Sequence, residues 1–543
     1  MLRRSHCQWA AVLAALFVNV HVAASAEPLH QRIDRLIEGQ PGFQGKAAQL
    51  ASDAEFLRRI YLDLIGTIPS TDEARAFLEN ASPKKREELI DKLLASPEHA
   101  RHLAHVFDTM LMERRAGKRI PEADWREFLR QSFAQNKPWD QLAREILLAD
   151  GLEPKLRPAA RFYLDREGEP HLLTKDIGRL FLGMNFQCNQ CHDNPVVRSY
   201  KQDHYFGIFA FFNRSFLFTD PKNKLVVFAE KGEGEATFQS VFDATKTTKT
   251  AAPRMPGRPP LKEPEFKKGE EYTVKPAKNV RPVPKFSRRQ QLADQITAPE
   301  NVAFRRNIAN RLWAHLMGRG LVHPLEYDHP DNPPAHPAVL DLLVEEVLAH
   351  KYDVRYLLRE LALTRTYQRS SLMPAGVEDV AAETFAVANL KPLSPEQLGF
   401  AIMQATGVTD IEKQALGAKL NEAALYPRLA RNMATFSNVF SKGAGEPEGE
   451  DFEVTIDQTL FMTNGPVVRS WLKPRAGNLT DRLLKLDEAD KLSDELYLTV
   501  FTRRPDADEV KAVAAYLKPR ADRAEAVQEI IWALLASSEF RFR

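Results

Sequence analysis

Apolar residues recur at helical spacing from about residue 31 to residue 214. One run repeats every four residues: Phe56, Ile60 and Leu64. Gly66, followed closely by a proline, is typical of a helix end. Ser70 and Glu73 then have the spacing of a capping box, which predicts the start of another helix. We therefore expect a helical domain over residues 27–215.

The pattern changes beyond residue 215. Three short runs are rich in β-forming residues: 216–218, 225–228 and 237–242. The third alternates like a half-buried strand. From Thr245 to Lys285 the chain is rich in Pro and Lys and poor in large apolar residues, which predicts an extended connector. Residues 216–286 are therefore expected to form a small β insertion and a connector.

Helical spacing returns near residue 287. Four apolar residues lie on one helical face: Phe304, Ile308, Leu312 and Leu316. Ser394 and Gln397 form a second capping-box pattern, with Pro395 at the first helical position. The chain is therefore predicted to be mainly α, with helical domains at 27–215 and 287–543 separated by the β insertion.

The first 26 residues have the features of a signal peptide. Arg3 and Arg4 precede an apolar run, and a small-residue site ends at Ala26. We expect cleavage after Ala26 and a periplasmic or extracellular location. The apolar run is short for a membrane span, so no span is expected after cleavage, and an uncleaved anchor is the alternative.

Charge and cysteine usage reduce the number of function classes that fit the chain. The chain has 75 basic and 73 acidic residues, and the leader carries two Arg and no acid, so its removal takes the formal net charge from +2 to zero. This balance leaves no excess of positive charge that would indicate nucleic-acid binding. Removal also takes Cys7 and leaves Cys188 and Cys191. A secreted chain of this size can fold without disulfides. We therefore interpret Cys188 and Cys191 as a chemically functional pair and not a structural one.

The sequence from Cys188 to His192 has the Cys-X-X-Cys-His pattern of c-type haem attachment. Two thiols on one helical turn can each bond a haem vinyl group, and His192 then supplies the proximal iron ligand. Met255, in a proline-rich segment, is the candidate distal ligand, and Met184 and His204 are weaker candidates.

Three other interpretations of this motif remain open. Cys188 and Cys191 can form a local disulfide in an oxidising compartment. They can also act as a redox pair, although no thioredoxin-like βαβ pattern surrounds them. A zinc site would use both cysteines, His192 and either Asp193 or His204, but adjacent Cys and His are awkward ligands of one tetrahedral ion.

Other polar residues suggest a second pocket less strongly. Arg306, Asn310 and Trp313 share one helical stripe, and a polar group lies further along the chain: Asp328, His329, Asp331 and His336. We favour caps and internal hydrogen bonds for these side chains. The sequence has no phosphate-binding Gly loop, nucleophile elbow or zinc-protease helix.

Several longer motifs resemble one family. In the first domain these are FLRRIYLDLIGTIP at 56–69, QCNQCHDNP at 187–195 and YFGIFAFF at 205–212. In the second they are NRLW at 310–313, GRGLV at 318–322, NPPAHP at 332–337, YQRSS at 367–371 and LSPEQL at 393–398. Over nearly all of the mature chain, the sequence resembles the planctomycete cytochrome-associated proteins, whose paired domains are of unknown function.

What the resemblance implies about function is limited, because both domains of the family are of unknown function. Many relatives carry a separate N-terminal cytochrome c domain, which we expect this chain to lack, so any haem would be on Cys188, Cys191 and His192. Asn194 stands where the family pattern commonly has His. We expect an exported redox or electron-transfer protein with one haem c, acting with a redox partner protein or an envelope polysaccharide. The alternatives are an envelope scaffold with a CxxC disulfide and an enzyme acting on polysaccharide.

Overall fold

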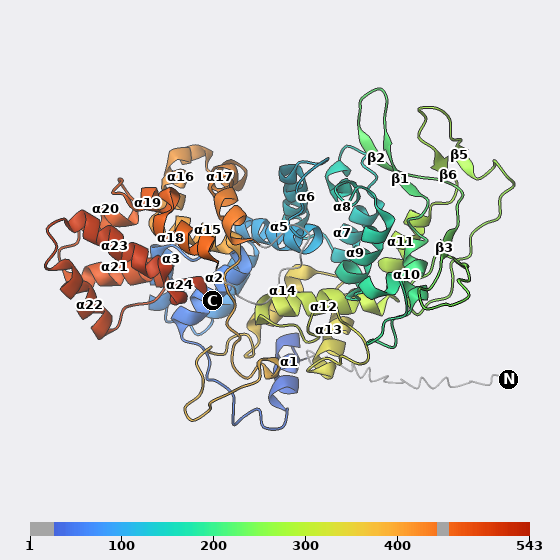
Figure 1. The fold of residues 1–543 in the computed structure, drawn as a ribbon. Helices are drawn as coiled ribbons and strands as arrows, with labels where there is room; N and C mark the ends of the chain where they lie inside the picture. The colour runs from blue at the N-terminus through green and yellow to red at the C-terminus, as the bar shows by residue number, and fades with distance from the viewer. Residues whose placement is uncertain (1–26, 442–454) are drawn as a thin grey trace, which may run out of the picture.

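The computed structural model describes residues 27–441 and 455–543, and its fold is mainly α-helical, as predicted (Figure 1). The proposed leader, 1–26, lies outside the described residues. The first helical segment contains α1 (Leu29–Glu38), α2 (Asp53–Ile65), α3 (Thr71–Glu79), α4 (Lys85–Leu94), α5 (Pro97–Met112), α6 (Glu122–Ala134), α7 (Trp139–Leu148), α8 (Arg161–Leu164), α9 (Pro170–Leu182) and α10 (Gln202–Phe209), with the short 3₁₀ helices η1 (Arg157–Ala160) and η2 (Gln187–Gln190).

The predicted end of α2 and the predicted start of α3 are confirmed. The Ser52 side chain caps the N-terminus of α2, and Gly66 ends the helix in the left-handed region at φ 75°. A side chain is excluded at Gly66 for a second reason, because a Cβ there would lie 2.4 Å from Nδ1 of His102. Ser70 and Glu73 form the predicted capping box of α3.

Three antiparallel strand pairs form the β insertion: β1 (Ser215–Thr219) with β2 (Val226–Glu230), β3 (Ala236–Phe238) with β4 (Lys249–Ala251), and β5 (Tyr272–Val274) with β6 (Val283–Pro284). The first pair is the predicted hairpin, with Leu217 opposite Phe228. Two predictions were wrong. The third strand stops at Phe238, well short of residue 242, and the connector from Thr245 to Lys285 contributes three short strands because it pairs with neighbouring backbone.

The second helical segment contains α11 (Arg288–Ile296), α12 (Val302–Met317), α13 (Pro337–Ala349), α14 (Val354–Leu363), α15 (Pro395–Thr406), α16 (Val408–Leu416), α17 (Glu422–Phe440), α18 (Ile456–Asn464), α19 (Pro466–Leu472), α20 (Leu479–Leu484), α21 (Ala489–Phe501), α22 (Ala507–Leu517), α23 (Arg523–Ala536) and α24 (Ser538–Arg541), with η3 (Ala382–Thr384) and η4 (Gly417–Lys419). The capping box of Ser394 and Gln397 starts α15 as predicted.

The buried apolar residues form two clusters that do not coincide with the two helical segments. The first contains residues from α1 to residue 386 together with Leu498 of α21, and it includes α11–α14, which contact α7, α9 and α4 of the first segment. The second joins residues 398–540 to Leu62 and Ile68. Because Ile60 and Leu64 belong to the first cluster, α2 contributes to both. The predicted domain division stays a prediction.

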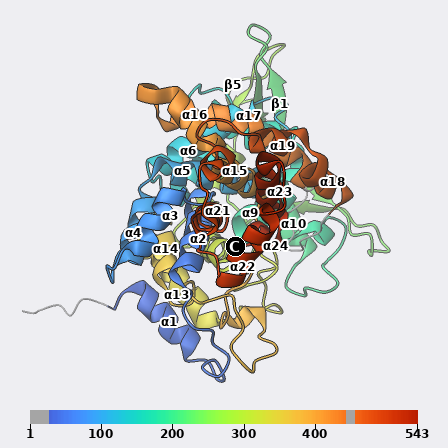
Figure 2. The same cartoon turned by 90° about the vertical axis from the view of Figure 1, so that its left-hand side faces the viewer.

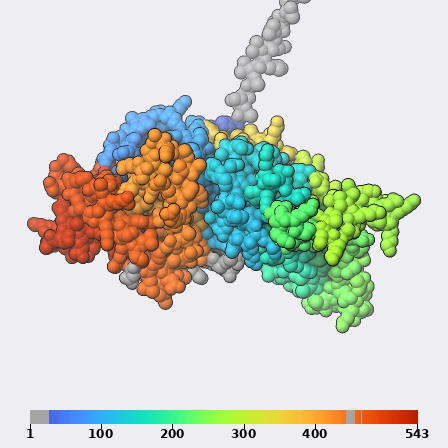
Figure 3. Space-filling model, turned by 90° about the horizontal axis from the view of Figure 1, so that it is seen from above, coloured from blue at the N-terminus to red at the C-terminus, as the bar shows by residue number. Residues whose placement is uncertain are grey.

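The two clusters lie along one elongated molecule. Seen from above, α22 and α23 occupy one end and the β insertion the other (Figure 3). A view onto the α20–α23 end places α1 and α13 on one side and β1 and β5 on the opposite side (Figure 2).

A buried carboxylate on α2 connects distant parts of the chain. The hydroxyl of Tyr367 donates to Oδ2 of Asp63 at 2.8 Å, and Nε of Arg543 forms an ion pair with Oδ1 at 2.8 Å. The guanidinium of Arg59 donates to the carbonyl oxygens of Tyr367 and Arg369, each at 2.7 Å. Two motifs of the family resemblance, 56–69 and 367–371, therefore meet here.

Helix α5 buries three histidines at three-residue spacing. Burial lowers the pKa of His99 and of His105 to about 4, and it lowers the pKa of His102 well below its usual range. Nδ1 of His99 lies 2.7 Å from the carbonyl oxygen of Leu64, and Nε2 of His105 lies 3.2 Å from the hydroxyl of Tyr426.

Acidification is expected to destabilise the protein through these histidines. A neutral buried His must gain a proton on unfolding, so its contribution is complete above the unfolded pKa of 6.5 and is lost as the pH falls toward 4. The free energy of unfolding should fall by about 2 kcal/mol per histidine between pH 7.5 and 5.0, measured by urea denaturation. His105→Gln should reduce this pH slope, because it removes one of the buried histidines. Equal stability at the two pH values would contradict the prediction.

Candidate functional site

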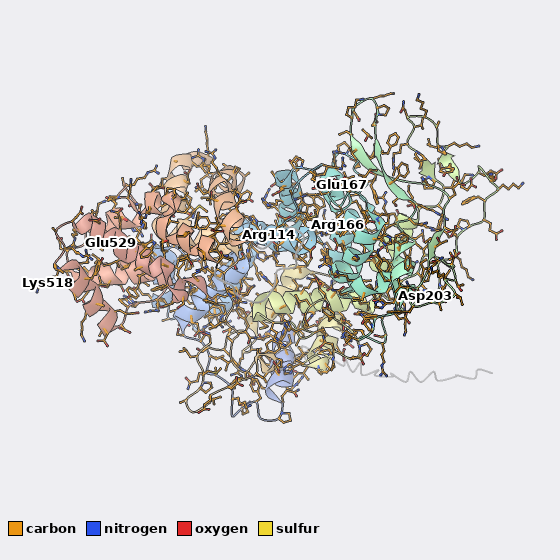
Figure 4. All side chains as sticks on the ribbon, in the orientation of Figure 1. Arg114, Arg166, Glu167, Asp203, Lys518 and Glu529 are labelled. Carbon is orange, nitrogen blue, oxygen red and sulfur yellow. The ribbon has the colours of Figure 1, made fainter. Side chains whose placement is uncertain are left out.

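The Cys-X-X-Cys-His motif lies on η2 and the loop that follows, between α9 and α10. The amide of Asn189 donates to the carbonyl oxygen of Phe186 at 2.9 Å, and that of Cys191 donates to the carbonyl oxygen of Cys188 at 3.4 Å. These bonds form the single turn that the spacing predicted. Both cysteines are exposed free thiols. Helix α10 contacts η2, and Asp203 of α10 is labelled in Figure 4, so this label shows at which end of the molecule the motif lies.

Buried amide groups hold the motif loop in place. Asn189, between the two cysteines, is buried, and its Nδ2 donates to the carbonyl oxygen of Tyr200 at 2.8 Å. The ring of Tyr200 packs against Phe186, with centroids 4.8 Å apart. Nε2 of Gln202 donates to the carbonyl oxygens of Gln190 and Gln239 at 3.3 and 3.1 Å. These three positioning residues could not be predicted from the sequence, because Asn189 occupies a variable position of the motif and Tyr200 and Gln202 lie outside it.

One ring nitrogen of His192 contacts a backbone carbonyl group. Its Nδ1 lies 2.6 Å from the carbonyl oxygen of Asp193. When Nδ1 carries the proton and donates to this oxygen, the lone pair is on Nε2, which is the arrangement of a metal-binding imidazole. The half-buried His192 ring also contacts Phe242, with centroids 4.9 Å apart.

Apolar side chains are exposed on the motif loop and beside it. Val196, Val241 and Phe242 are 79%, 65% and 77% exposed. The amide of Val241 donates to the carbonyl oxygen of Cys191 at 3.1 Å, which brings this segment to the motif. In the strand predicted over 237–242, Phe242 would lie on the same face as the buried Phe238. Instead Val196, Val241 and Phe242 form, with the two thiols and His192, what we call the motif surface.

The candidate distal ligands have different surroundings. Met255 is buried in the first cluster, and the preceding residue, Arg254, donates its amide to the carbonyl oxygen of Gly207 at 3.0 Å. Met184 is half-buried, and burial lowers the pKa of His204. The distal role of Met255 stays a prediction.

Residues 27–441 and 455–543 bear on two further expectations, a zinc site and a membrane span. No group of three or more His, Cys, Asp or Glu side chains is placed to hold a metal ion, so the zinc alternative has no ligand cluster there. No helix in the same ranges is long and apolar enough to cross a membrane.

The polar residues of α12 have the structural roles that we favoured. Arg306 forms two hydrogen bonds with the carboxylate of Asp328, at 2.9 and 3.0 Å. Asn310 bonds both backbone groups of Val322, at 2.8 and 3.0 Å. Nε2 of His336 lies 2.9 Å from the carbonyl oxygen of Glu383. Arg306 and Asn310 are therefore hydrogen-bonded within the protein, whereas Nε1 of Trp313 and Nδ1 of His336 are buried without a hydrogen-bond partner among the described residues.

Fold and motif surface together define a mainly helical protein with one exposed CxxCH loop. Residues 32–216 match a family model described as a protein of unknown function (DUF1549), and residues 288–517 match a second with the same description (DUF1553). The chain therefore belongs to the family of these paired domains of unknown function, the architecture of the planctomycete proteins that it resembles. No curated protein and no solved structure matches the chain.

Replacing Asn189 should weaken the motif loop. Asn189→Ala removes a buried hydrogen bond to Tyr200 and should lower the free energy of unfolding by about 1–2 kcal/mol, measured by urea denaturation. Ser199→Ala, at an exposed position of the same loop, should change it by less than about 0.5 kcal/mol. Equal losses in both variants would show that Asn189 does not hold the loop.

Proposed function

We propose that this is an exported redox protein of the cell envelope whose motif surface carries one c-type haem. Cys188 and Cys191 would hold the haem through thioether bonds to its vinyl groups, and His192 would bind the iron. When bound, a c-type haem supplies reversible one-electron chemistry at its iron. The observation that carries the proposal is the contact between Nδ1 of His192 and the carbonyl oxygen of Asp193, beside two exposed free thiols.

The thiols support this proposal by their accessibility. Haem attachment needs two reduced cysteines that a bulky planar molecule can reach, and both cysteines are free and exposed. The buried Asn189 between them fixes the turn, so both thiols lie on the surface side of the loop. A structural cysteine, by contrast, is usually buried and inert.

His192 and its neighbours add a second argument. Hydrogen bonding of Nδ1 to a backbone carbonyl fixes the imidazole tautomer and orientation, as in most metal-binding histidines. Exposed apolar side chains have a use here as well, since Val196, Val241 and Phe242 would pack against an apolar ring edge and exclude water from it. Water exclusion around an iron centre is one means by which a protein sets its reduction potential.

The first test is covalent attachment. Cys188→Ala combined with Cys191→Ala should abolish denaturant-resistant haem staining of protein matured in a host that makes c-type cytochromes, because both thioether bonds are lost. His192→Ala keeps both thiols and should alter the haem absorption spectrum or block maturation, because it removes an iron ligand.

Met255→Leu provides the matched control for that experiment. It should leave the covalent stain intact, and a changed spectrum in this variant would identify Met255 as the distal ligand. A native protein that binds no porphyrin, and whose mass is lower than that of the reduced chain by two hydrogen atoms, would contradict the proposal. That result would favour the disulfide scaffold, and turnover of an envelope polysaccharide would favour the enzyme.

Export is tested separately. The native protein should begin at Glu27, because the small residues before it form a signal-peptidase site. Mass spectrometry of the N-terminal peptide from its own host measures this. A peptide spanning Ala26 and Glu27 in the mature protein would refute cleavage.

A further inference from the structure

The β5–β6 hairpin has an excess of positive charge, although the formal net charge of the whole chain is only +2. From Lys267 to Lys285 the sequence contains six basic and two acidic residues, which gives a formal net charge of +4. The two acidic residues, Glu270 and Glu271, precede β5. The tip of the hairpin, residues 274–280, therefore carries positive charge and no carboxylate.

The two lysines of this tip have no partner in the protein. Lys275 and Lys278 are both exposed, and neither forms an ion pair with another described residue. Arg281, which follows the tip, differs from them because its guanidinium is paired with the carboxylate of Asp150 at 2.6 Å. The ammonium groups of Lys275 and Lys278 are therefore available to an anionic partner.

Apolar side chains are exposed beside these lysines. Val274 and Val280 are 39% and 41% exposed, and they flank Lys275 and Lys278 in the chain. A lysine side chain also has an aliphatic stem that can lie along an apolar surface while its charged end stays in a polar layer. The tip thus offers positive charge and apolar area over the same few residues.

The backbone of the tip is suited to a surface where water is scarce. Pro276 has no N–H group, and the amide of Val280 donates to the carbonyl oxygen of Ala277 at 3.1 Å. Unpaired backbone donors are costly outside water. Neither Pro276 nor Val280 would leave such a donor if the tip entered an apolar layer.

The β1–β2 hairpin provides a second basic tip, residues 220–225. Its turn contains Lys222 and Lys224, which are both exposed, and β2 contacts β6, so the two hairpins are neighbours. The carboxylate of Asp220 in this turn accepts a hydrogen bond from the amide of Lys222 at 2.7 Å. Figures 1 and 2 show both hairpins on the side of the molecule opposite to α1. We call residues 220–225 and 274–280 the basic tips.

We propose that the basic tips dock the protein on an anionic lipid surface. The lysine ammonium groups bind lipid phosphates, while the lysine stems and the two valines lie at the boundary of the acyl chains. A soluble acidic polymer would use the charges and leave the valines in water, so the exposed valines favour lipid. The docking is peripheral, because only the tips enter the interface. It involves none of Cys188, Cys191 and His192 and does not depend on haem.

Co-sedimentation of the mature full chain with lipid vesicles tests this docking. One set of vesicles is pure phosphatidylcholine, and in the other set one lipid in three is phosphatidylglycerol. We expect binding to the anionic vesicles that weakens as salt is added, because salt screens the lysines, and much weaker binding to the neutral vesicles. Equal binding to both sets, or no binding to the anionic set, would overturn the proposal.

Neutralising the tip lysines should weaken this binding. Lys275→Gln combined with Lys278→Gln should lower the partition coefficient for anionic vesicles roughly 25-fold, because each lysine near an anionic surface contributes about fivefold. Lys473→Gln combined with Lys518→Gln is the matched control, since it removes the same charge from exposed lysines at the opposite end, where Figure 4 labels Lys518. The control should bind like the unaltered protein. An equal loss in both pairs would attribute binding to total charge and overturn docking through the tips.

The two valines distinguish lipid from a soluble acidic polymer. Val274→Ser combined with Val280→Ser keeps every charge and should weaken binding to anionic vesicles about tenfold, because less apolar area leaves water. These positions are exposed, so the substitutions should not disturb folding, and thermal melting checks this. A valine variant that binds the vesicles as tightly as the unaltered protein would refute docking on lipid and favour an acidic polymer as the partner.

Discussion

The buried carboxylate of Asp63 imposes the strongest constraint on this fold. A carboxylate removed from water is tolerated only when it is paired and hydrogen-bonded, and burial raises the pKa of this one. Its partners come from sequence positions far from α2, because Tyr367 is 304 residues away and Arg543 is farther still. Separating these segments would leave an uncompensated charge in the interior. Arg59 adds to the constraint, since its buried guanidinium needs the backbone carbonyls of Tyr367 and Arg369.

The local features of the fold could be predicted from the sequence where one short segment determines them. The α2 end at Gly66 and the capping boxes at Ser70 and Ser394 depend on residues within one or two turns. The β1–β2 hairpin could be predicted for the same reason. The short strands within residues 245–285 could not, because each is only two or three residues long and lies in a segment rich in proline and lysine. Nor could the sequence indicate that α11–α14 would share a core with the first helical segment.

The candidate site, too, could be predicted from the sequence only where one short segment determines it. Spacing alone identified Cys188, Cys191 and His192, since the motif is contiguous. The residues that hold the loop, Asn189 and Tyr200, have roles that depend on a buried contact across eleven positions. The exposure of Phe242 contradicts the alternating pattern, which places this residue on the same face as the buried Phe238. Such conflicts between local pattern and final structure are expected at functional sites, where binding competes with stability.

The position of α2 in both apolar clusters has a consequence for dissecting the protein genetically. Leu62 packs in one cluster while Ile60 and Leu64 pack in the other, so every side of this helix is covered by protein. A fragment ending in the β insertion would uncover the residues of α2 that normally meet the last helices. A fragment starting at residue 287 would lack α2 altogether. The two halves that sequence families treat as separate units should therefore be produced together, and their folding should be coupled through this single helix.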